Sequence, residues 1–226
     1  MDWIERTARA VDHDGVEAEA PAEAVEAMIA FEQRYGGLWC PALGPNGMEY
    51  GLDGDARVYW TAQGWVFYGI VDGDWTWGVE VLLDGRAGMT LADKPLRILN
   101  RSIDQRLEAH ALLLAVHRRP HLTLELALPQ GTTPVLVGTD LLPWVDEASG
   151  PTDLWWFDGA SAVHLHLSNW WTKDHDIWVA RCFSRDTTAL NQIREALLNE
   201  VTELLQLREV WCSLCGRHTT SGRPCL

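Results

Sequence analysis

Four potential metal ligands lie near the end of the chain. Cys212 and Cys215 form a Cys-x2-Cys pair, in which a tight turn can hold two thiolates on one zinc ion. His218 and Cys225 can complete a tetrahedral Cys3His set, although the spacing is not that of a standard zinc finger. Four protein ligands leave no open coordination position, so we expect a structural zinc. The alternative is a tail of reduced cysteines without metal.

A second group of potential ligands is His164, His166 and His175. The first two alternate along an expected strand, so both imidazoles point to the same face. With His175 they could hold the metal of a metal-dependent hydrolase. We favour the alternative that these side chains form the solvated side of an antiparallel strand.

Cys182 is the remaining candidate for chemistry, as a nucleophile with a histidine base. It shares a strand face with Trp178, however, and this pattern favours a buried structural cysteine. The sequence contains no Gly-rich phosphate loop, no Gly-x-Ser-x-Gly elbow and no His-Glu-x-x-His helix. We therefore expect no enzymatic activity.

The charge of the chain is strongly negative and unevenly distributed. The formal net charge is −14, and residues 1–93 hold 17 acidic and five basic residues, a net of −12. Residues 94–226 hold 15 acidic and 13 basic residues, a net of −2. Such a surface repels nucleic acid and attracts a basic protein partner. The alternative is an acidic face that serves solubility alone.

Aromatic residues in the acidic half could anchor such a partner. The chain has 13 tryptophans, and exposed Trp and Tyr side chains are favoured at the centres of interfaces. For each aromatic residue, burial in the core is the alternative. The candidate partner-binding residues lie on or beside Asp/Glu-rich loops: Glu49, Asp53, Asp55, Asp72, Asp74, Trp39, Tyr50 and Trp60.

Three helices are expected from apolar residues at helical spacing. They span residues 22–35, 102–117 and about 189–207, within the usual boundary error. Gly36-Gly37 suits a left-handed end for the first helix. The expected buried stripes are Ala24, Met28, Phe31 and Tyr35 in the first helix; Ile103, Leu107, Ala111 and Leu114 in the second; and Leu190, Ile193, Leu197, Val201 and Leu204 in the third.

Strands are expected in both halves. Residues 56–83 read as a β-meander, in which apolar residues alternate along the chain from Trp75 to Leu83. Hairpin turns are expected at Gln63-Gly64 and Asp72-Gly73, and a further Asp/Gly turn at Leu83-Asp84-Gly85. Further strands are expected at residues 122–128, 135–138, 154–157, 161–167 and 177–183, with an Asp158-Gly159 turn between the third and the fourth.

One element suggests a family. Phe31-Glu32-Gln33-Arg34-Tyr35-Gly36-Gly37 closes the first helix, and strands broken by Asp/Gly turns follow it. This order resembles the SUKH superfamily, over about residues 20–116. The resemblance implies an α+β fold with an antiparallel or mixed sheet flanked by helices. It also implies an immunity protein that binds and neutralises a cognate bacterial toxin by occlusion.

We therefore expect a SUKH-like domain at residues 1–120, a closely packed α+β extension at 121–209 and a zinc-binding tail at 210–226. A zinc-stabilised adaptor or scaffold protein is the alternative function. No run of 18 apolar residues and no secretory signal appear, so we expect a cytoplasmic protein without a membrane span. We expect a monomer or weak dimer.

Overall fold

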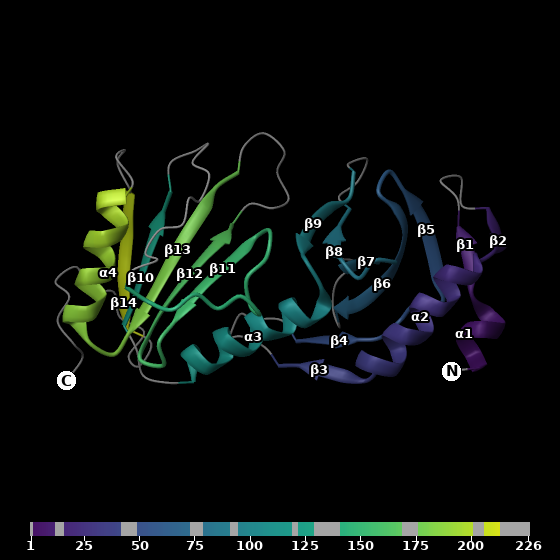
Figure 1. Ribbon diagram of the computed structural model, residues 1–226, viewed down its shortest axis with the longest axis horizontal. Helices are drawn as coiled ribbons and strands as arrows, with labels where there is room; N and C mark the ends of the chain where they lie inside the picture. Colours follow the sequence, from purple (N-terminus) through teal and green to yellow (C-terminus); the bar gives the residue numbers. More distant parts are fainter. Residues whose placement is uncertain are drawn as a thin grey trace. The chain divides into compact units, whose positions relative to one another are not determined.

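The chain folds into two compact units, Met1–Ile103 and Asp104–Leu226, which we call the first and the second unit (Figure 1). Among the described helices, none is long and apolar enough to cross a membrane. The structure is a computed structural model, and it describes residues 2–11, 16–41, 49–72, 79–90, 95–118, 122–128, 141–168, 176–200 and 206–212.

The first unit is a mixed sheet with two helices. In the part described, its nine strands follow the order β2-β1-β5-β6-β7-β8-β9, with β4 paired to β6 and β3 paired to β4. Only β1 and β5 pair in parallel among these strands. The elements are α1 (Asp2–Thr7), β1 (Arg9–Val11), β2 (Glu17–Glu19), α2 (Ala22–Tyr35), β3 (Leu38–Cys40), β4 (Tyr50–Leu52), β5 (Arg57–Thr61), β6 (Gly64–Asp72), β7 (Val79–Leu82), β8 (Ala87–Met89) and β9 (Arg97–Asn100).

Helix α2 packs on one face of this sheet. Its buried residues Ala24, Met28 and Phe31 recur at intervals of four and three, so the expected helix and these members of its stripe are confirmed. Phe31 meets Phe67 of β6 edge to face, with ring centroids 5.4 Å apart. Gly69 provides the space for the Phe31 ring, because a Cβ there would lie 2.7 Å from Phe31 Cζ.

The end of α2 is bonded to the segment around β4. Gly37 has a φ of 78°, a left-handed conformation that favours glycine, so the expected helix stop is confirmed. The Gly37 amide donates to the Leu52 carbonyl at 3.0 Å. The Glu32 carboxylate accepts a hydrogen bond from the Gly54 amide, also at 3.0 Å. Glu32 of the family-like element, residues 31–37, therefore holds the loop that follows β4.

The opposite sheet face carries a second apolar cluster and a buried carboxyl group. Burial raises the pKa of Glu80, and a 2.6 Å hydrogen bond donated by the Thr90 hydroxyl lowers it in part. All four residues of β7 are buried, so the expected alternation of buried and exposed residues is wrong there. The cluster contains Val66, Leu82 and Leu96, with Tyr59 and Ile98 packed against it.

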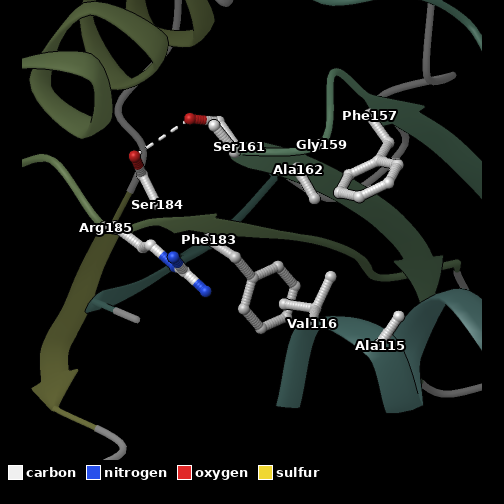
Figure 2. Close-up of a pocket in the computed structure, with 10 residues that line it drawn as sticks. Ala115, Val116, Phe157, Gly159, Ser161, Ala162, Phe183, Ser184 and Arg185 are labelled. Atoms are coloured by element: carbon white, nitrogen blue, oxygen red, sulfur yellow. Dashed lines mark hydrogen bonds between the residues drawn. The ribbon is translucent and has the colours of Figure 1, made fainter. Parts of the chain in front are cut away.

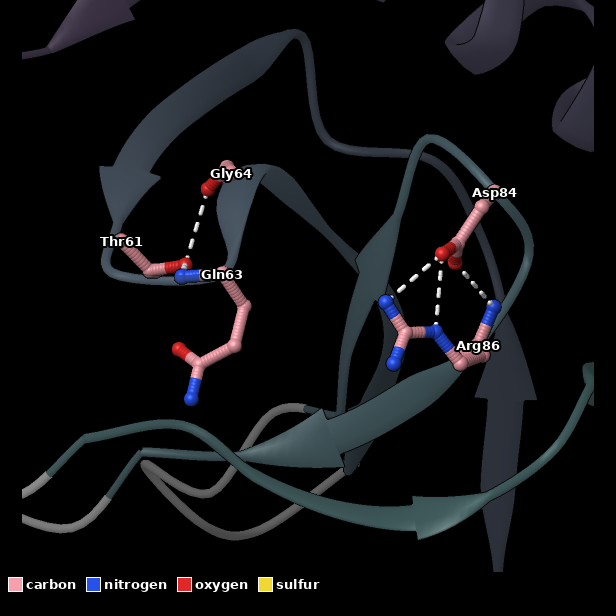
Figure 3. A network of polar contacts seen from close by, with 5 residues as sticks. All are labelled: Thr61, Gln63, Gly64, Asp84 and Arg86. Atoms are coloured by element: carbon pink, nitrogen blue, oxygen red, sulfur yellow. Dashed lines mark hydrogen bonds and ion pairs between the residues drawn. The ribbon is translucent and has the colours of Figure 1, made fainter.

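Two tight turns of the first unit are fixed by side chains (Figure 3). The Thr61 hydroxyl donates to the Gly64 carbonyl at 2.8 Å and accepts from the Gln63 amide at 3.2 Å. In the turn between β7 and β8, the Asp84 carboxylate accepts from the Arg86 backbone amide at 3.1 Å and from Arg86 Nε at 2.8 Å. The turns expected at these two positions are confirmed.

The second unit is a separate antiparallel sheet with two helices. Its strand order is β11-β12-β13-β10-β14, with β14 paired to β10 at the edge. The α+β class expected from the sequence is therefore confirmed. The elements are α3 (Ile103–His117), β10 (Leu122–Ala127), β11 (Asp153–Phe157), β12 (Ser161–Leu167), β13 (Trp178–Ser184), α4 (Thr187–Glu200) and β14 (Gln206–Cys212).

Each face of this second sheet is covered by one helix (Figure 1). On one face, Leu190, Ile193 and Leu197 of α4 join the leucine-rich core, as the sequence predicts. On the other face, α3 packs over Trp155 and Phe183. Alternate strand residues therefore point into two different apolar layers.

The buried stripe of α3 differs in part from the expected one. Ile103 is buried as expected and Leu107 and Leu114 are half-buried, but Ala111, expected inside, is exposed. The residues that pack on the sheet are Ala109, Leu112, Leu113 and Val116, which also have helical spacing. Helix α3 is apolar over much of its circumference, so helical spacing alone is compatible with more than one buried stripe. Packing on the sheet of the second unit determines which residues are buried.

Two boundaries also differ from the expected ones. The expected division between the two units was at residue 120, but the units divide after Ile103. Helix α3 therefore belongs to the second unit, because the apolar residues of α3 pack on the sheet of that unit. Residues 206–207, expected at the end of a long helix, begin β14 instead, because they extend the ladder with β10. The strand expected at residues 135–138 lies outside the described residues. So do Gly73 of the expected Asp72-Gly73 turn and two members of the third helix's expected stripe, Val201 and Leu204.

Candidate functional site

Trp39 is a large ring displayed on the short strand β3. Its side chain is 59% exposed. Gly51 pairs with Trp39 across β3 and β4, and a Cβ on Gly51 would lie 2.9 Å from both Cε3 and Cζ3 of the indole. The ring therefore rests on the Gly51 backbone. The indole Nε1 donates a hydrogen bond to Glu49 Oε2 at 3.1 Å.

Trp60 is the second exposed aromatic residue of the expected set. It lies on β5, is 64% exposed and meets Trp65 of β6 edge to face, with ring centroids 5.1 Å apart. Tyr50, the third expected anchor, is only 8% exposed. Tyr50 is part of the core, so its prediction as an exposed anchor is wrong; the alternative of burial holds for this residue.

The expected acidic residues have different degrees of exposure. Glu49 and Asp53 are exposed, and Asp55 is half-buried. The backbone of this loop is held at two points, by the bond from the Gly54 amide to Glu32 and by a 3.0 Å bond from the Asp55 amide to the Tyr68 carbonyl. Asp72 ends strand β6, and Asp74 lies outside the described residues.

The first unit as a whole is acidic. It holds 17 acidic and eight basic residues, a net charge of −9. Within it, the exposed Trp39 is in direct contact with an acidic side chain, Glu49. An aromatic ring beside a carboxylate is suited to a cationic group of a partner.

His164 and His166 do share a face of β12, but that face is not the solvated side of the sheet. His164 is 5% exposed and stacks on Trp155, with ring centroids 4.1 Å apart and planes 9° from parallel. Its Nε2 donates to Asp153 Oδ1 at 2.7 Å, and its Nδ1 is buried without a hydrogen-bond partner among the described residues. The His166 ring stacks on the His164 ring, with ring centroids 4.8 Å apart. The expectation of a solvated face is therefore wrong.

The charges of this cluster follow from its burial. Burial, together with His164 and Arg181, lowers the pKa of His166 to about 3, although Asp153 acts to raise it. Burial alone would raise the pKa of Asp153, but the hydrogen bond from His164 and nearby positive charges hold it below its usual value. His166 is thus neutral and Asp153 is ionised at neutral pH.

The His164–Asp153 pair has the geometry that orients an imidazole in catalytic triads. Burial of the ring, however, denies a substrate access to it. No group of three His, Cys, Asp or Glu side chains in the described part of the chain is arranged to hold a metal ion. His175, the third residue of the expected hydrolase site, lies outside that part. The stacked rings and the bond from His164 to Asp153 join β12 to β11.

The structure tests the prediction for Cys182 but not the predicted zinc site. Cys182 is fully buried, and burial raises the pKa of its thiol to about 12, so the expected structural cysteine is confirmed. Cys212 is the last residue of β14. Cys215, His218 and Cys225 lie outside the described residues, so the zinc site stays a prediction.

A small pocket lies between the C-terminal half of α3 and the strand ends of the second unit (Figure 2). Val116 and Phe183 form its apolar side, and Arg185 borders it. Ser161 and Ser184 line it as well, with a 2.9 Å hydrogen bond between their hydroxyls. The volume of about 20 Å³ holds a single water molecule and is too small for an organic substrate.

Three residues that shape these clusters were not predicted from the sequence. Gly51 lies under the Trp39 ring, and Asp153 and Trp155 complete the histidine cluster. Asp153 and Trp155 could have been found from the register of the β11–β12 hairpin. When the pairing is counted outward from the Asp158-Gly159 turn, Trp155 lies opposite His164. The register of the β3–β4 hairpin would similarly have indicated Gly51.

Comparison of the chain with protein-family models, curated proteins and solved structures finds no match in any of the three.

Proposed function

We propose that the protein is an immunity protein that binds a cognate basic toxin and neutralises it by occlusion. The observation that carries the proposal is the exposed Trp39, held against the Glu49 carboxylate in a unit of net charge −9. Isolated apolar side chains are common on protein surfaces, but a Trp fixed by two contacts beside a carboxylate is suited to anchor a cationic partner.

The resemblance to the SUKH superfamily supports the proposal independently. Helix α2 ends at Gly36-Gly37, and antiparallel strands and then α3 follow in the order typical of that family. Within the family-like element, Phe31 packs in the core and Glu32 bonds to Gly54. The element therefore builds the fold, and exposed residues elsewhere in the unit, such as Trp39, are left to contact the partner.

Occlusion requires no chemistry from this chain. A toxin that acts on nucleic acid has a basic cleft, and an acidic surface steers such a cleft toward itself. Charges at the rim, such as Asp53, then raise the association rate, and a ring at the centre, such as Trp39, slows dissociation. The toxin is silenced because its substrate can no longer enter the cleft.

Co-expression tests the proposal. Each candidate toxin domain from the same locus is expressed in a bacterial host with and without this protein, and growth is measured. The proposal predicts that one toxin stops growth alone and permits growth with the wild-type protein. The variant Trp39→Ala should protect less than the wild type at equal abundance. Growth arrest by every toxin of the locus despite abundant folded protein would refute the immunity function.

A further inference from the structure

The surroundings of Trp39 differ from those of Trp60, the other exposed tryptophan of the expected set. Trp60 touches a neighbouring ring, Trp65, whereas Trp39 touches a glycine backbone and a carboxylate. The six-membered ring of Trp39 lies on Gly51, and its pyrrole nitrogen is bonded to Glu49 at the opposite end. Both ends of the indole are therefore held, although 59% of the side chain is exposed.

Fixing the indole in this way prepares it for binding. A ring that is already oriented loses less rotamer freedom when a partner covers it. The glycine is required for this position, since a Cβ at residue 51 would lie 2.9 Å from two ring carbons and displace the ring. The Nε1 bond places the Glu49 carboxylate at the ring edge, next to the exposed ring surface.

The two groups together match one chemical class of ligand. The face of an indole attracts a cation, and a carboxylate accepts charge-assisted hydrogen bonds. A guanidinium is planar, so it can stack on the ring and donate N–H groups to the carboxylate at the same time. An ammonium is a compact, strongly hydrated charge and gains less from stacking.

We infer that Trp39, seated on Gly51 and bonded to Glu49, is a recognition site for an arginine side chain of the protein partner. The inference rests on the proposed function, because it specifies which partner group the acidic unit recognises. The net charge of −9 supplies long-range attraction for a basic partner, and Trp39 with Glu49 supplies the preference for arginine over lysine.

A peptide probe tests the site without any toxin. Fluorescein-labelled octa-arginine and octa-lysine are titrated with the protein, and the dissociation constants are measured by fluorescence anisotropy. The variants Trp39→Leu and Trp60→Leu leave the net charge unchanged, so non-specific attraction to the acidic unit is the same in all three proteins. Trp60→Leu is the matched control, because it removes an equally exposed tryptophan from the same unit.

We expect Trp39→Leu to weaken octa-arginine binding about two- to fivefold, as for an exposed cation–π contact, and to weaken octa-lysine binding less. Trp60→Leu should bind as the wild type does. Equal binding by Trp39→Leu and the wild type, or an equal loss in Trp60→Leu, would overturn the inference.

A measurement on the wild-type protein serves if the Trp39 variant fails to fold. The indole Nε1–H NMR signal of Trp39, assigned by its loss in Trp39→Phe or by sequential assignment, should shift as octa-arginine is added. A shift at the Trp60 indole alone, or none at either, refutes the site. No toxin is present in these peptide measurements, so a failed co-expression test would not change their result. If the peptide measurements fail instead, the co-expression test can still show immunity through another surface.

Discussion

Acidification should destabilise the second unit through His166. This histidine stacks on His164, and burial, together with the charges of His164 and Arg181, lowers its pKa to about 3, from 6.5 in an unfolded chain. A depressed histidine pKa means that the folded state favours the neutral ring. The stabilisation is therefore complete above pH 6.5, and it is lost progressively as the pH falls from 6.5 toward about 3.

The expected size follows from the linkage between proton binding and folding. Each pH unit within the window costs about 1.4 kcal/mol of unfolding free energy. Between pH 6.5 and pH 5 the second unit should therefore lose about 2 kcal/mol because of this one ring. Asp153 lies in the same cluster, but its pKa is below the usual value, so it stays ionised over this range.

Urea unfolding at pH 7.5 and pH 5 measures the effect, followed by NMR signals of β12 and β13 so that the second unit alone is observed. His166→Gln removes the titrating ring. Between the two pH values, the free energy of unfolding of this variant should fall by about 2 kcal/mol less than that of the wild type. His117→Gln, which replaces an exposed histidine, should lose as much as the wild type. An equal loss in the wild type and His166→Gln, or a His166 ring that titrates near pH 6.5, would refute the reasoning.

Three other outcomes are expected. Gly69→Ala should destabilise the first unit by about 1–3 kcal/mol in urea unfolding, because its Cβ meets Phe31 and Val81; an unchanged midpoint would contradict the packing described. Metal-replete protein should contain about one zinc per chain by elemental analysis, and Cys212→Ser less; a metal-free protein with an ordered tail would contradict this. The purified protein should show no metal-dependent hydrolysis, and an activity abolished by His166→Ala would overturn that expectation.

Local features of the fold could be predicted from the sequence. Helix α2, its buried residues and its stop at Gly37 follow from spacing and glycine, which act within a few residues. The turns at Gly64 and Asp84 follow from local chemistry in the same way. Such features depend little on the rest of the chain, so single-sequence patterns are sufficient for them.

Features set by distant contacts could not be predicted in this way. The stripe of α3 depends on which sheet the helix meets, and strand β14 depends on its pairing with β10. The exposure of His164 was also misjudged, because the sequence does not show that α3 and Trp155 cover that face. Among the candidate anchors, Trp39 and Trp60 are exposed and Tyr50 is not, and only the three-dimensional arrangement distinguishes them.

The proposed capture of a basic toxin by the acidic first unit is tested most directly by the association rate of the cognate toxin domain. This rate is measured by stopped flow at low and high salt. The test compares the wild type with a variant in which Glu49, Asp53 and Asp55 are each replaced by lysine. The proposal predicts a wild-type rate that falls steeply with salt, and a rate for the variant at least about tenfold lower at low salt. A rate unaffected by salt and by the three charge reversals would contradict it.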